Sequence, residues 1–169
     1  SYINAGADVI TVNTYSATKI ALRNAGIEEK FKKWNRLAVQ LTKETLAECD
    51  PSRPVYVAGS VSTFASSSRF GRSWKDGTGE LKLWFREQAE LLVESGVDLL
   101  LIETLASESS VMSAAVEAAS EFDVPIWVAL SCARDRKTGE LSLGVEESSS
   151  QSQTFYAYHE PFDLALDKL

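Results

Sequence analysis

The sequence predicts an α/β fold in which about four parallel strands alternate with helices. Two observations support this prediction. Four short apolar runs are nearly continuous rather than alternating, which is typical of strands that a parallel sheet buries on both faces. Between these runs, apolar residues recur at helical spacing, and the resulting order of strands and helices requires parallel pairing through helical crossovers. The length of 169 residues and the hydrophobic fraction of 44% suit one domain with a sizeable core.

The four expected strands share a pattern at their carboxyl ends, where a polar residue closes the apolar run. The strands are expected at residues 9–15, 55–61, 99–105 and 126–132. Their polar residues are, in chain order, Asn13, Ser60, Glu103 and Ser131. Parallel α/β sheets and barrels build their binding sites at the carboxyl ends of the strands. These four residues are therefore the candidate site residues of the chain.

Each candidate also has a purely structural interpretation. Asn13 and Ser60 are equally well explained by hydrogen bonds to the backbone at the point where the chain leaves its strand. Glu103 directly follows four apolar residues, and a buried carboxylate is costly without a partner. Glu103 is therefore either half of a structural ion pair or a functional carboxylate, and the second interpretation is favoured.

Three helices are expected between the strands. The first covers residues 28–48, and its stripe consists of Phe31, Trp34, Leu37, Leu41 and Thr45. The second stripe consists of Leu81, Trp84, Phe85, Gln88, Leu91 and Leu92. The third consists of Val111, Ala114, Ala115, Ala118 and Phe122. Each stripe is expected to pack against the sheet.

The turn before the first strand resembles the turn before the third. The sequence GAD at residues 6–8 aligns with GVD at residues 96–98, and the strands that follow also align. The distances between the units differ, which excludes a solenoid of fixed period. The pattern indicates βα units that share one type of turn into the strand.

The composition excludes several classes of partner and site. The chain has 17 basic and 24 acidic residues, and the net charge of −7 argues against a nucleic acid or an anionic membrane surface. No apolar run is long enough to span a membrane. Two cysteines are too few for a disulfide framework, so a reducing compartment and a cytoplasmic location are expected. One histidine is too few for a multi-histidine metal site.

Both ends of the sequence resemble interrupted helices. Residues 1–6 have the pattern of a helix that is about to end, and residues 163–169 have the pattern of a helix that begins. The only methionine is Met112. We therefore expect residues 1–169 to be one barrel domain that is incomplete at both ends, within a longer parent protein.

Five segments in the same order resemble the homocysteine S-methyltransferase family. They are AGADVITVNTY (5–15), VAGSV (57–61), DGT (76–78), GVDLLLIETL (96–105) and PIWVALSC (125–132). The resemblance covers roughly residues 1–145. No segment is diagnostic alone, since a similar turn precedes strands in many barrels, but the five together are specific. The resemblance implies a partial (β/α)8 TIM barrel that contains strands two to five of the family fold.

The resemblance also implies an activity and small-molecule substrates. Family members transfer a methyl group to the sulfur of homocysteine and form methionine, with S-methylmethionine or S-adenosylmethionine as the expected donor here. Glu103 matches the strand-end acid that contacts the amino group of homocysteine. Asn13 matches a position facing the same mouth, and Ser60 and Ser131 are expected near its rim.

The family's metal site is expected outside this chain. The family binds one zinc ion through three cysteine thiolates, and zinc holds the homocysteine sulfur as a thiolate. Cys49 and Cys132 match no ligand position, so the resemblance places the ligands after Leu169. We therefore expect neither a catalytic residue nor a metal ligand in this chain, and zinc only in the parent protein.

Two alternatives remain open. One is another barrel enzyme in which Glu103 acts as a general base. The other is a noncatalytic, truncated product, which is the favoured interpretation of residues 1–169 taken alone. In either case a partial barrel leaves open sheet edges, so we expect self-association.

Overall fold

The computed structural model describes residues 2–62, 79–105, 109–134, 138–143 and 160–161. Four strands form one parallel sheet in the order β1-β2-β3-β4, which is also their order along the chain. Their bounds are Val9–Thr11, Tyr56–Ser62, Leu99–Leu105 and Ile126–Leu130. The predicted α/β fold with four parallel strands is confirmed. The expected helix at residues 163–169 lies outside the described residues.

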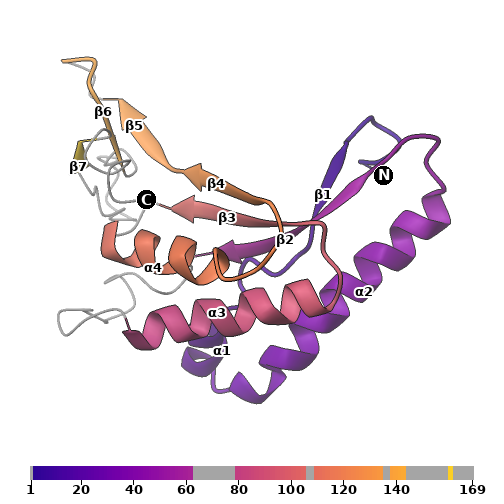
Figure 1. The fold of residues 1–169 in the computed structure, drawn as a ribbon, viewed down its shortest axis with the longest axis horizontal. Coiled ribbons are helices and arrows are strands. Elements are labelled where there is room, and N and C mark those ends of the chain that lie inside the picture. Colours follow the sequence, from indigo (N-terminus) through magenta and orange to yellow (C-terminus); the bar gives the residue numbers. More distant parts are fainter. Residues whose placement is uncertain (1, 63–78, 106–108, 135–137, 144–159, 162–169) are drawn as a thin grey trace.

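The helices lie together on one side of this sheet, as Figure 1 shows. They are α1 (Lys19–Asn24), α2 (Phe31–Cys49), α3 (Gly79–Glu94) and α4 (Ser109–Ala119), and a 3₁₀ turn, η1 (Glu28–Lys30), precedes α2. Sequential parallel strands with every helix on one face are the arrangement of a segment of a (β/α) barrel. In the part of the chain that the structure describes, none of the helices is both long and apolar enough to cross a membrane.

A second, antiparallel sheet follows β4 and was not expected. It consists of β5 (Cys132–Arg134), β6 (Leu141–Leu143) and β7 (Glu160–Pro161). The expected strand at residues 126–132 is therefore divided at Ser131. The pairing of β3 with β4 shifts register between Ile102 and Leu105, and the chain leaves the parallel sheet just beyond this irregularity.

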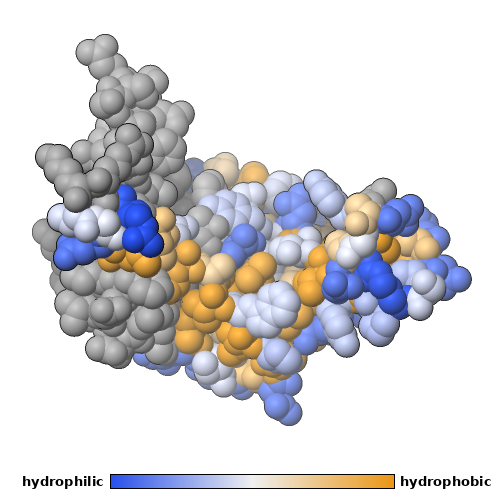
Figure 2. Space-filling model, turned by 90° about the horizontal axis from the view of Figure 1, so that it is seen from above, coloured by the Kyte–Doolittle hydropathy of each residue, from blue (hydrophilic) through white to orange (hydrophobic). Residues whose placement is uncertain are grey.

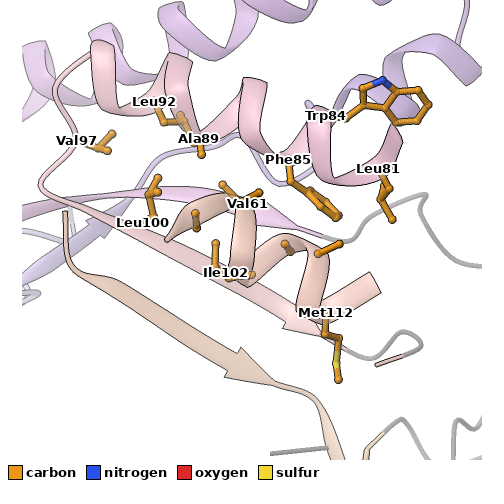
Figure 3. Close-up of a cluster of buried hydrophobic side chains, with 14 of the residues drawn as sticks. Val61, Leu81, Trp84, Phe85, Ala89, Leu92, Val97, Leu100, Ile102 and Met112 are labelled. Carbon is orange, nitrogen blue, oxygen red and sulfur yellow. The ribbon is translucent and has the colours of Figure 1, made fainter. Parts of the chain in front are cut away.

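The core lies between the sheet and helices α3 and α4 (Figure 3). All six residues of the predicted α3 stripe are buried, which confirms that prediction. Leu92 of α3 and Leu100 and Ile102 of β3 are 0% exposed. Gly59 of β2 lets α3 come close, because a Cβ atom there would lie 3.2 Å from Leu92. The core therefore fixes the height of α3 above the centre of the sheet.

The prediction for the packing face of α2 was wrong except at Phe31. Its buried residues are Phe31, Asn35 and Val39, whereas Trp34 and Leu41 of the predicted stripe are exposed. The reason is that the residues of α2 that face the core are spaced by four, and the polar Asn35 is one of them. Helical periodicity shows that a helix has an apolar side, but it does not show which neighbour that side contacts.

The two outer strands are less buried than predicted. All residues of β2 after Tyr56 are buried, but in β4 Trp127 is 52% and Val128 is 40% exposed. In the described part of the chain β4 pairs only with β3, and β1 pairs only with β2. Figure 2, a view onto the strand side, shows hydrophobic surface across the middle of the molecule. Burial on both faces therefore holds for β2, whereas Leu101 and Glu103 of β3 are partly exposed.

The predicted similarity of the turns before β1 and β3 is confirmed. Gly6 and Gly96 both have positive φ angles, of 102° and 83°. Each is followed by a residue whose backbone N–H donates five residues back, to Tyr2 and to Leu92 respectively. This is the Schellman arrangement that closes a helix, and glycine is preferred there because it adopts positive φ without a Cβ clash. Residues 2–7 thus have the hydrogen bonds of a helix end, as their sequence predicted.

Candidate functional site

The candidate site lies at the carboxyl ends of β2 and β3, where Ser60 and Glu103 meet. Their strands pair with Ser62 opposite Glu103, and Val61 and Ile102 belong to the core under the helices. Because side chains alternate along a strand, Ser60, Ser62 and Glu103 lie on the opposite face of the sheet. The Ser60 hydroxyl donates a hydrogen bond of 2.5 Å to Oε1 of Glu103. The structure thus brings together two of the four predicted site residues.

The surroundings of Glu103 suit a carboxylate that binds a cation. Its side chain is partly exposed, whereas Ser60 is 0% exposed. Glu103 forms no salt bridge with any other residue that the structure describes, so the ion-pair interpretation finds no support in these residues. Among the residues that the structure describes, Oε1 is the carboxylate oxygen of Glu103 that accepts a hydrogen bond. A carboxylate held in this way is suited to bind an ammonium group.

The loop after β1 is fastened to the end of β2. The Thr14 hydroxyl donates to the carbonyl of Ser60 at 2.7 Å, and the Ser62 hydroxyl donates to the carbonyl of Tyr15 at 2.5 Å. Thr14, Ser60 and Ser62 are all fully buried. These bonds fix one wall of the candidate site relative to the strand that carries Ser60.

A second pair of buried side chains supports this loop from the helix side. Gln88 of α3 donates through Nε2 to the carbonyl of Thr14 at 3.4 Å and to Oδ1 of Asn35 at 3.1 Å. Asn35 of α2 donates to the carbonyl of Ala17 at 3.0 Å. The helical periodicity of the sequence includes Gln88 in an apolar stripe and gives it no role in the site. The sequence signal for its role is a glutamine in a stripe that is otherwise apolar. A buried polar side chain requires hydrogen-bond partners, so such a glutamine is expected to bond to neighbouring segments.

Asn13 lies in a different environment from Glu103. It lines an open groove with a volume of about 310 Å³ together with Ile3, Ile10, Ala38, Leu41, Thr42 and Thr45. The backbone N–H of Thr14 donates to the carbonyl of Val12, so the chain turns tightly at Asn13 and the alternation of the strand ends there. The groove therefore lies between β1 and α2, and the structure shows no hydrogen bond between Asn13 and Glu103.

Ser131 occupies the single residue between β4 and β5 and is partly exposed. No hydrogen bond joins it to Glu103 in the structure. Ser131 and Asn13 share the predicted end of the sheet with Glu103, but the structure places only Ser60 in contact with it.

The two cysteines do not form a metal site. Cys49 ends α2, ahead of the amino end of β2, whereas Cys132 begins β5, beyond the carboxyl end of β4. Both are free thiols. Among the residues that the structure describes, no group of three or more His, Cys, Asp or Glu residues is placed to hold a metal ion. The described residues therefore do not fit the three-thiolate zinc site that the resemblance implies.

Comparisons with known proteins identify a family and a shared fold. The model of the family described as homocysteine S-methyltransferase matches residues 1–156. Among solved structures, the chain is similar to the metallated form of the homocysteine methyltransferase MmuM from Escherichia coli, with a TM-score of 0.68 and 22% identity. This match covers 99% of the chain and 55% of that protein. The apo form of MmuM matches with a TM-score of 0.49 and 26% identity, over 75% of the chain and 44% of that protein.

The structural comparison bears on the fold and on the extent of the chain. At 22% identity, the likeness to the metallated form shows a shared fold, and it confirms the predicted partial (β/α)8 barrel. The chain spans about half the length of the solved relatives that it matches.

Proposed function

Because the chain belongs to the homocysteine S-methyltransferase family, we propose that it supplies the amino-acid-binding part of an enzyme that methylates homocysteine to methionine. The observation that carries this proposal is the Glu103 carboxylate, partly exposed at the carboxyl end of β3 and held by Ser60. The substrates are small molecules, homocysteine and a methyl donor. S-methylmethionine and S-adenosylmethionine are the proposed donors.

In this proposal Glu103 binds the ammonium group of homocysteine and takes no part in proton transfer. A charge-assisted hydrogen bond from an ammonium group to a carboxylate is about twice as strong as a neutral one. It orients the amino acid so that its sulfur faces the donor. Contacts of Asn13 and Ser131 with the substrate remain predictions, whereas Ser60 is buried behind the carboxylate to which it donates.

The chemistry at sulfur balances without an external oxidant or reductant. The homocysteine thiol loses its proton to solvent, and a lone pair of the resulting thiolate forms a bond to the methyl carbon. The bond from that carbon to the donor sulfonium breaks at the same time, which leaves the donor as a neutral thioether. A thiol is a poor nucleophile at neutral pH, and a metal ion corrects this by stabilising the thiolate. We propose zinc as that metal in the complete protein, with ligands other than the described residues.

The proposal is tested on protein expressed from the complete reading frame that contains this sequence. The measurements are methionine formation from homocysteine with each donor, and zinc content by elemental analysis. We expect methionine with at least one donor, about one zinc ion per chain, and loss of activity when the zinc is chelated. A well-folded protein that binds no zinc and forms no methionine would contradict the proposal and favour a noncatalytic chain.

We also propose that the 169-residue chain alone associates with itself through the exposed sheet. Trp127 and Val128 on the outer strand β4 are about half exposed, and an apolar outer strand invites pairing with another copy. Sedimentation velocity is expected to show oligomers whose fraction rises with concentration. Trp127→Lys should reduce them, whereas Leu83→Lys, at a 64% exposed position on α3, should not. A monomeric boundary with cooperative melting would exclude this association.

A further inference from the structure

The hydroxyl group of Ser60 contacts the Glu103 carboxylate from beneath the surface of the site. Ser60 is 0% exposed, so a ligand at the surface of the site does not touch it. Its hydroxyl donates to Oε1 of Glu103, and its carbonyl accepts from the hydroxyl of Thr14. Through these two bonds Ser60 joins the end of β3 to the loop after β1.

We propose that Ser60 is a positioning residue that holds the Glu103 carboxylate in the orientation that binds the ammonium group of an amino-acid substrate. This inference rests on the proposed function. A glutamate side chain loses rotamer freedom when it binds a ligand, and a fixed hydrogen bond restricts those rotamers beforehand. With Oε1 bound to Ser60, Oε2 is the oxygen that meets the ammonium group. Ser60 therefore acts on substrate binding only through Glu103.

Ser62 provides a matched control on the same strand. It is also 0% exposed, it lies on the same face as Ser60, and its hydroxyl donates to the carbonyl of Tyr15 in the loop after β1. Ser62→Ala therefore removes the same hydroxyl group from an equally buried place while it leaves the bond between Ser60 and Glu103 intact. A purely structural role of buried serines predicts the same result for both variants.

The experiment compares two ligands on protein from the complete reading frame. Homocysteine carries the ammonium group, and 4-mercaptobutanoate is the same molecule without it. Ser60→Ala is expected to weaken homocysteine binding by about tenfold, as for the loss of one hydrogen bond to a charged group, and to leave 4-mercaptobutanoate binding within about twofold. In turnover, KM for homocysteine should rise while kcat changes little. Ser62→Ala should change the affinities for the two ligands equally.

The double variant Ser60→Ala/Glu103→Gln separates this inference from the proposed function. If Ser60 acts through Glu103, Ser60→Ala adds almost nothing once Glu103→Gln is present. Additive losses, or equal losses for both ligands, would overturn the positioning role while Glu103 remained the ammonium contact. If Glu103→Gln itself left homocysteine binding unchanged, the proposed function would fail first. Should Ser60→Ala not fold, Ser60→Cys keeps a similar size with a weaker donor and is measured in the same way.

Discussion

Replacement of Glu103 by alanine is expected to raise the KM for homocysteine by about a hundredfold in the complete protein. The variant removes one partner of a charge-assisted contact, which costs roughly 3 kcal/mol of binding energy. Little stability should be lost, because Glu103 is partly exposed and forms no salt bridge with the other described residues. Steady-state kinetics and a thermal unfolding curve measure both quantities.

The pattern of the kinetic change distinguishes the roles considered for Glu103. An ammonium contact raises KM for homocysteine, whereas a general base lowers kcat with KM nearly unchanged. Glu94→Ala is the matched control, because its carboxylate on α3 is exposed and pairs with Arg36 at the surface. It should leave both constants unchanged. A Glu103 variant with an unchanged KM would remove this residue from the site.

Replacement of Leu92 by alanine is expected to lower the free energy of unfolding by about 3 kcal/mol. Leu92 is 0% exposed and packs in the core between α3 and the sheet, and large-to-small substitutions at such places cost roughly 2–5 kcal/mol. Its neighbour across the interface is Gly59, which has no side chain to move into the space. Chemical denaturation measures the difference.

Leu83→Ala is the control for this core prediction. It removes the same atoms from the same helix, but Leu83 is 64% exposed, so the change should stay within about 0.5 kcal/mol. Equal losses for the two variants would show that the packing face of α3 differs from the one in Figure 3.

Helices α2 and α3 show how well the spacing of apolar residues predicts which side of a helix is buried. The α3 stripe was predicted correctly because a helix between the sheet and its neighbours buries a broad apolar side. In α2 the same reasoning selected Phe31, which is buried, but also Trp34 and Leu41, which are exposed. It missed Asn35 and Val39, which are buried. Asn35 is buried because Gln88 and the carbonyl of Ala17 satisfy its amide, and those partners belong to other segments.

The candidate site was predictable in its residues but not in its contacts. The polar residue after each apolar run was visible in the sequence, and Glu103 and Ser60 indeed lie at one end of the sheet. Their hydrogen bond joins residues 43 positions apart and depends on the register of β2 against β3. Asn13 has the same sequence signature, but a tight turn at that residue places it in the groove beside α2.

By itself, the sequence determined the order of the four parallel strands and of helices α2, α3 and α4, the shared turns at Gly6 and Gly96, and the polar ends of the strands, but not α1 or the second sheet. Each of the features that it determined follows from a pattern within a few consecutive residues, where backbone preference and periodicity act directly. Only the tertiary structure decided that Ser60 holds Glu103, that Gln88 and Asn35 support the loop after β1, and that β4 remains exposed. These features depend on which distant segments become neighbours, and that is settled by strand register and helix packing.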